Sequence, residues 1–170
     1  MSAPISDAGR LSLFDTHAHL RPGDDDRALL RAARDAGVDR LVVAAGTLDE
    51  SRHAWSLARR EEGVWATAGL HPHEAETHDG DLEPYRELLA TPETIAVGEI
   101  GLDYYYDTSP RQEQRTVFQQ FLALAGELDL PAVIHCRDAY DDCLAILKET
   151  LRRGQRFEIH CYTGTRAWAE

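Results

Sequence analysis

The chain has 170 residues, of which 43% are hydrophobic and 28% charged, and its formal net charge is −12 at pH 7. This length and composition predict a single globular domain over residues 1–170. The acidic balance argues against a broad basic surface that grips nucleic acid by its phosphates, although bound divalent cations can supply local positive charge. No stretch has the roughly 18 uninterrupted apolar residues of a membrane helix, and the N-terminus lacks a signal-peptide core, so we expect a cytoplasmic protein without membrane association.

Six short apolar runs rich in β-formers alternate with amphipathic helical stretches, which is the pattern of a parallel α/β fold. The predicted strands, in chain order, are Leu11–Asp15, Arg40–Ala45, Val64–Ala68, Ile95–Gly98, Ala132–His135 and Phe157–His160. Helix signals fall between them: acidic residues at the start of 24–36 with Gly37 as a stop, a capping box at Thr47-x-x-Glu50, and Ser109-Pro110 with Pro at the first helical position. A further helix over 139–153 ends at Gly154.

The predicted elements give about six βα units. A closed (β/α)₈ barrel has eight strands and typically about 250 residues. Residues 166–170 begin another helix without a stop signal. We therefore expect an incomplete TIM (β/α)₈-type barrel, either a fragment or a naturally shortened relative, whose C-terminal part is missing. Its two uncovered sheet edges predict a partner chain that covers them.

The three cysteines, Cys136, Cys143 and Cys161, are an odd number without metal-type spacing. This usage fits a reducing compartment. Cys136 and Cys161 each follow a candidate ligand, so on a strand they would point to the opposite face. We interpret all three as packing residues.

Metal-ligand residues lie at the ends of four predicted strands. His17 and His19 follow the first strand two residues apart, Glu99 follows Ile95–Gly98, and His135 and His160 each end an apolar run. The carboxyl ends of parallel strands meet at one end of such a fold, where active sites are built. Imidazole and carboxylate together suit divalent Mg, Mn or Zn. A single H-x-H or a lone buried His is as often structural, but the four strand ends together predict a metal site.

The chemistry that uses such a set is metal-assisted hydrolysis, in which two cations lower the pKa of a bridging water. A carboxylate is still needed as general base. Asp103, Asp107 and Asp138 are candidates, but each follows its strand by several residues, which favours a loop or ligand-supporting role.

The motifs around these residues resemble the TatD family of metal-dependent deoxyribonucleases. They are Phe14-Asp-Thr-His-Ala-His19, Gly69-Leu-His-Pro-His73, Val97-Gly-Glu-Ile-Gly-Leu-Asp103, Val133-Ile-His-Cys-Arg-Asp138 and His160-Cys-Tyr-Thr-Gly164. The resemblance covers essentially the whole chain and implies an amidohydrolase-superfamily barrel with two divalent metals. It also implies 3′→5′ exonuclease hydrolysis of DNA phosphodiesters, on single strands or at 3′ ends.

Carried over by position, His17 and His19 would bind the first metal, Glu99 would bridge, and His135 and His160 would hold the second. The family's remaining ligand and proposed general base is an Asp after the seventh strand, which we expect beyond Glu170.

Three further residues are predicted to contact substrate. His71, which with His73 matches cleft-lining family positions, has a structural hydrogen bond as its alternative role. Arg137 is suited to a phosphate, with a salt bridge to a neighbouring Asp as the alternative. Tyr104 begins a run of three tyrosines that either stack on bases or pack over the barrel.

Two other functions stay open. Related metal-dependent barrels cleave amides or esters, including aminoacyl-tRNA esters, and the fold alone does not separate these activities. An inactive or partner-dependent barrel fragment is the second alternative. For this chain we expect little or no metal-stimulated release of nucleotides from single-stranded DNA.

Overall fold

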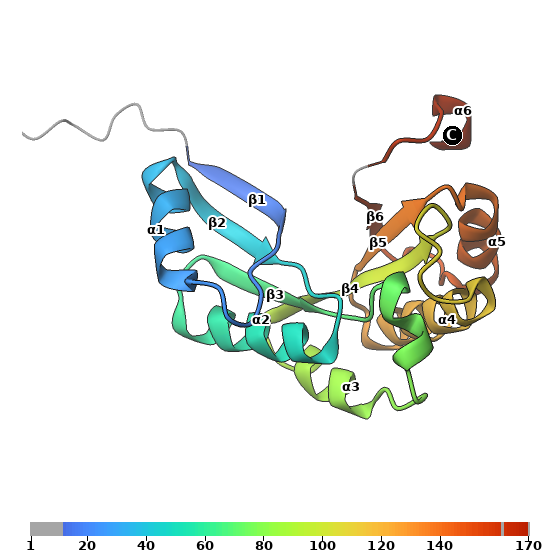
Figure 1. Cartoon of the computed structure of the whole chain (residues 1–170), viewed down its shortest axis with the longest axis horizontal. Helices are drawn as coiled ribbons and strands as arrows, with labels where there is room; N and C mark the ends of the chain where they lie inside the picture. Colours follow the sequence, from blue (N-terminus) through green and yellow to red (C-terminus); the bar gives the residue numbers. More distant parts are fainter. Residues whose placement is uncertain (1–11, 161, 170) are drawn as a thin grey trace, which may run out of the picture.

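The computed structural model describes residues 12–160 and 162–169, which contain one parallel sheet with the strands in sequence order. The sheet curls into a half-barrel, and the longer helices lie along its outer side (Figure 1). The strands are β1 (Leu13–Ala18), β2 (Val38–Val43), β3 (Val64–Ala68), β4 (Thr94–Asp103), β5 (Ala132–Arg137) and β6 (Phe157–Ile159). The predicted barrel-type α/β fold of about six βα units is confirmed.

Five α-helices and one 3₁₀ helix connect the described strands, and a sixth α-helix follows β6. They are α1 (Asp26–Asp35), α2 (Leu48–Arg60), η1 (Pro72–Thr77), α3 (Glu83–Leu89), α4 (Arg111–Leu128), α5 (Tyr140–Thr150) and α6 (Arg166–Ala169). The sequence did not predict η1 and α3, because segments this short carry too little periodicity. None of the helices in the described ranges has the length and apolar character required to cross a bilayer.

Two predicted helix starts have different outcomes. Thr47 caps α2 by accepting the Glu50 N–H at 3.1 Å, while the Glu50 carboxylate accepts the Gly46 N–H at 2.9 Å. The capping box is therefore confirmed, with its return bond one residue earlier than the usual pattern. The placement of Pro110 inside the next helix was wrong: Pro110 has ψ 133° and is the N-cap of α4.

Strand β4 is much longer than predicted. Glycines on either side of Glu99-Ile100 favour a turn of the backbone, which is why the sequence predicts a strand that ends at Gly98, but the strand continues to Asp103. Gly101 lies beside His135 in the register of β4 and β5, and a Cβ there would meet the His135 carbonyl oxygen. Here glycine marks a close approach of two backbones, which is its other common role within a strand.

The core lies between the sheet and its outer helices. The larger cluster joins β4 and β5 to α4 and α5 through fully buried side chains such as Phe118, Phe121 and Ile134. Cys136 and Cys143 are buried free thiols in this cluster, so the packing interpretation is confirmed for both. Cys161, like Leu11 of the first predicted strand, lies outside the described residues.

The two edge strands carry exposed apolar side chains. Phe14 on β1 and Phe157 on β6 are each 43% exposed. An uncovered apolar edge can pair with another strand. The partner chain expected to cover these edges stays a prediction.

We expect Gly101→Ala to lower the free energy of unfolding by about 1–3 kcal/mol more than Gly23→Ala, because the methyl group pushes β4 away from β5. Both glycines have positive φ, 139° and 97°, but a Cβ on Gly23 would have no neighbour within 4 Å. Urea unfolding followed by circular dichroism measures the difference. Equal losses in the two variants would show that the approach of β4 to β5 does not constrain position 101.

Candidate metal centre

Four of the predicted ligand histidines surround the carboxylate of Glu99, which is only 3% exposed on β4. Oε1 of Glu99 lies 2.9 Å from His135 Nδ1 and 2.8 Å from His160 Nε2. Oε2 lies 3.3 Å from His17 Nε2 and 3.8 Å from His19 Nε2. The two carboxylate oxygens therefore face different histidine pairs, and these are the pairs that the family resemblance implies.

His17 shows that this cluster fits a cation. Both ring nitrogens of His17 are buried without a hydrogen-bond partner, and its ring stacks on that of His160 at a centroid distance of 4.0 Å. Burying a polar atom without a partner is costly. A cation between Glu99 and these rings would supply a partner for Nε2 of His17, the nitrogen that faces Glu99. Imidazole with carboxylate is a normal ligand set for divalent metals.

Grouping the candidate ligand atoms by their distances from one another gives sets that differ from the predicted histidine pairs. It places His17, Glu99 and His160 in one set and His71, Glu99 and His135 in another, with the ligand atoms of each set within 4.8 Å of one another. His160 thus lies close to both halves of the centre, and His71 joins as an additional candidate.

The hydrogen bonds of His71 argue against a ligand role. Its Nδ1 accepts the backbone N–H of His73 at 3.2 Å. A neutral imidazole that accepts at Nδ1 carries its proton on Nε2. The Nε2 of His71, 3.8 Å from Glu99 Oε1, is therefore an N–H donor directed at the centre.

The protonation states follow from burial and hydrogen bonding. Burial raises the pKa of Glu99, but hydrogen bonds from His135 and His160, together with the nearby ring of His17, outweigh it and hold this pKa well below its ordinary range. Burial lowers the pKa of His71 to about 3, although the charge of Glu99 opposes this. The hydrogen bond to Glu99 raises the pKa of His160 against the effect of burial. Near neutral pH the centre holds an ionised carboxylate, and His71 is uncharged.

A cavity of about 350 Å³ opens over the centre. Its lining includes His19, His71, His135 and His160, and also His73 and Arg21. Arg21, which the sequence analysis did not single out, has a 68% exposed side chain 3.6 Å from the Glu50 carboxylate. Its only signal in the sequence is its position two residues after His19, in the loop that follows β1.

Asp103 lies deeper in the fold than predicted. It ends β4 and is fully buried, because the strand extends past the predicted boundary. Its Oδ2 lies 2.8 Å from His73 Nε2 and 3.1 Å from His135 Nε2. Burial raises the pKa of Asp103, but hydrogen bonds from the Tyr106 backbone, His73 and His135 lower it by a larger amount. The carboxyl group is therefore ionised.

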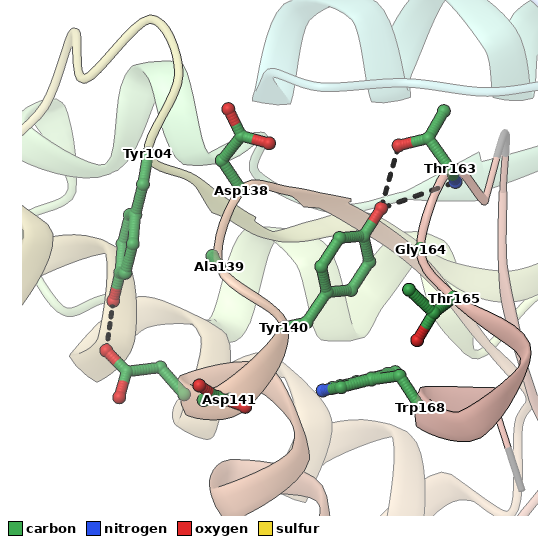
Figure 2. A pocket seen from close by; sticks show the side chains of 10 residues that line it. Tyr104, Asp138, Ala139, Tyr140, Asp141, Thr163, Gly164, Thr165 and Trp168 are labelled. Carbon is green, nitrogen blue, oxygen red and sulfur yellow. Dashed lines mark hydrogen bonds between the residues drawn. The ribbon is translucent and has the colours of Figure 1, made fainter.

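The other two candidate bases lie elsewhere. Asp107 is exposed and accepts a hydrogen bond from Arg111 at 3.0 Å. Asp138 lines a hollow of about 640 Å³ beside the start of α5, together with Asp141, Tyr140 and Trp168 (Figure 2). The structure brings neither of them to the carboxylate of Glu99.

Tyr104 also lines the hollow of Figure 2, where its hydroxyl donates to Asp142 at 2.6 Å. It is not among the residues lining the cavity over Glu99. The next two tyrosines are more open, with Tyr105 58% and Tyr106 56% exposed. The guanidinium of Arg137 lies 4.0 Å from the ring centre of Tyr105 and 4.8 Å from that of Tyr106.

The sequence matches relatives of known family. The family described as TatD related DNase matches residues 14–170. The 3'-5' ssDNA/RNA exonuclease TatD of Cronobacter turicensis is 42% identical over 144 residues, 84% of this chain and 55% of the relative. The relative of the same description from Escherichia coli is 38% identical over 158 residues, 91% of this chain and 61% of the relative. The chain thus spans less than two thirds of the length of these relatives.

Solved structures agree with this assignment. The crystal structure of YjjV, a TatD homologue from Escherichia coli, has a TM-score of 0.83 and 32% identity, covering 94% of this chain and 63% of that one. A TatD-family hydrolase from Entamoeba histolytica shares the fold with a TM-score of 0.80 at 22% identity. Both the sequence and the fold matches extend over nearly the whole chain, and the chain belongs to the TatD related DNase family.

Proposed function

We propose that this chain provides the metal centre of a hydrolase that cleaves DNA phosphodiester bonds, releasing nucleotides from 3′ ends. The observation that carries the proposal is the division of the Glu99 oxygens between two histidine pairs. Two divalent cations would be held, one by His17 and His19 and one by His135 and His160, with Glu99 bridging.

Bound cations would supply an activated water and charge neutralisation at the phosphate. The protein's own contribution is to hold the ligands before substrate arrives. Glu99 stays ionised, and the buried nitrogens of His17 lack any competing hydrogen bond. His71 directs an N–H at the same space, where it is suited to a phosphate oxygen.

The proposed substrate is a single strand or 3′ end of DNA. Relatives at about 40% identity are described as 3'-5' ssDNA/RNA exonucleases. In this chain, Arg21 and Arg137 are the cations at and beside the cavity, and Tyr105 and Tyr106 offer exposed rings for base stacking. The hollow lined by Tyr104 also carries three carboxylates, which repel phosphates. If Tyr104 contacts a base, the phosphate backbone of the DNA would therefore lie outside this hollow.

We expect divalent metal to stabilise the protein through Glu99. At a free metal concentration of 100 times Kd, one site adds about 2.7 kcal/mol to the free energy of unfolding. Thermal unfolding with Mg²⁺, Mn²⁺ or Zn²⁺ and with a chelator measures this, and ranking the three shifts identifies the preferred metal. Glu99→Gln should lose the shift, whereas Glu127→Gln, on the exposed face of α4, should keep it.

We expect any metal-dependent release of nucleotides from 5′-labelled single-stranded DNA to fall at least about 100-fold in Glu99→Gln, because the amide cannot bridge two cations. Separation of products by length distinguishes stepwise 3′ removal from internal cleavage. Release that persists in chelator would contradict the proposal. A chain that binds metal but leaves DNA intact would favour the alternative, an inactive domain that needs a carboxylate or partner from elsewhere.

We expect Arg137→Met to weaken binding of fluorescein-labelled single-stranded DNA by about three- to tenfold, because removing one phosphate contact costs on the order of 1 kcal/mol. Fluorescence anisotropy in Ca²⁺, or on the Glu99→Gln background, measures binding without cleavage. Arg115→Met is the matched control, since Arg115 pairs with Asp142 on the outer side at 2.8 Å. Equal effects of the two substitutions would leave Arg137 without a specific substrate contact.

The proposal treats residues 1–170 as one domain whose edges β1 and β6 are covered in the working enzyme. The exposed rings of Phe14 and Phe157 support this, since an apolar edge left open favours pairing with another strand. A partner chain that covers these edges is part of the proposal, and concentration-dependent association in sedimentation experiments would identify a second copy of this chain as that partner.

A further inference from the structure

Among the described residues, Asp103 is the one buried carboxylate beside the metal centre that the proposed mechanism does not use. It has no exposed surface and, unlike Glu99, belongs to neither group of potential metal ligands. Glu99, Gly101 and Asp103 alternate along β4, so their inward positions lie on one face of the strand.

Four hydrogen bonds occupy the carboxylate of Asp103. Oδ1 accepts the backbone N–H groups of Tyr105 at 3.0 Å and Tyr106 at 2.9 Å. Oδ2 lies 2.8 Å from His73 Nε2 and 3.1 Å from His135 Nε2. A buried, fully hydrogen-bonded carboxylate is a poor acceptor for a proton from water, which excludes Asp103 as the general base.

The ring of His135 lies between two carboxylates. Its Nδ1 is 2.9 Å from Glu99 Oε1 and its Nε2 is 3.1 Å from Asp103 Oδ2. An ionised carboxylate only accepts hydrogen bonds, and a neutral imidazole has one N–H to give. With a cation held between Glu99 and Nδ1, both sides are satisfied: Nδ1 supplies its lone pair to the cation and Nε2–H donates to Asp103.

We propose that Asp103 is a positioning residue that fixes His135 in the Nε2–H form, so that Nδ1 is the atom that binds metal. The inference rests on the metal centre proposed above. Carboxylates placed behind metal-binding histidines act in this way, and their loss typically weakens metal binding by about 10- to 100-fold.

The same carboxylate ties this ligand to the rim of the cavity. Through Oδ1 it holds the backbone of Tyr105 and Tyr106, the two exposed rings that flank Arg137. Through Oδ2 it holds His73, whose backbone N–H fixes the ring of His71. One buried group therefore orients both a ligand and the residues proposed to meet substrate.

The substitution Asp103→Asn tests this orientation. The backbone N–H groups of Tyr105 and Tyr106 have no alternative form, so the amide oxygen must face them and the NH₂ group must face the histidines. His135 Nε2 would then have to accept, which moves the ring proton to Nδ1 and blocks the lone pair that faces Glu99.

The experiment combines calorimetric Zn²⁺ titration with ¹⁵N NMR of the histidine rings in the Zn²⁺-loaded chain, with His135 assigned by comparison with His135→Gln. We expect metal at Nδ1 and a proton on Nε2 of His135. Asp103→Asn should weaken one Zn²⁺ site by 10- to 100-fold. Asp142→Asn, a matched change at a carboxylate outside the cavity, should alter it by less than twofold.

Zinc bound through His135 Nε2 would overturn the proposal even if Asp103→Asn does not fold, because the ring assignment uses the unsubstituted chain. Unchanged Zn²⁺ affinity in a folded Asp103→Asn variant would also overturn it. Neither result affects the proposed metal centre. A chain that binds no divalent metal would overturn both proposals, whereas lack of nuclease activity with metal bound would count against the proposed function and leave the role of Asp103 standing.

Discussion

The structure depends on one buried negative charge. The carboxylate of Glu99 lies inside the curled sheet with only 3% of the residue exposed, and it stays ionised because histidines from several strand ends donate toward it. A buried charge without such partners would cost several kcal/mol. The requirement explains why the ends of β1, β4 and β5 and the residue after β6 must meet within hydrogen-bonding distance of one side chain.

Much of this site could be predicted from the sequence because strand ends and ligand residues coincide. His135 and His160 close apolar runs, and the parallel topology alone brings such positions together. The pairing of histidines on the two oxygens of Glu99 was implied by family resemblance and agrees with the distances. Strand position does not specify the orientation of a ring, which is why the sequence could not decide between a substrate contact and a structural hydrogen bond for His71, whose Nδ1 accepts the His73 N–H.

The sequence did not predict the length of β4, the burial of Asp103 or the different positions of the three tyrosines, because the local sequence at these points is compatible with more than one structure. Gly98 and Gly101 give the same signal as a turn, so β4 was ended five residues early and Asp103 was placed in a loop. Only the contact between Gly101 and the backbone of His135 shows that the glycine serves close packing. The three consecutive tyrosines could not be told apart either. Their chain positions differ by one residue, but Tyr104 turns into an acidic hollow while Tyr105 and Tyr106 flank Arg137.

The net charge of −12 and a DNA substrate are compatible because charge is distributed unevenly around the cavity. The carboxylates of Asp138, Asp141 and Asp142 gather beside the start of α5, whereas Arg21 and Arg137 stand at and beside the opening over Glu99. In the proposed function, a strand would therefore be drawn to the cavity by bound cations and two arginines and kept away from the neighbouring hollow. Since few side-chain cations would release counterions, affinity should depend on metal occupancy more steeply than on monovalent salt. This arrangement favours contacts with a few nucleotides at a DNA end over extended contacts along a duplex. Removal of nucleotides from an end requires contacts of the first kind.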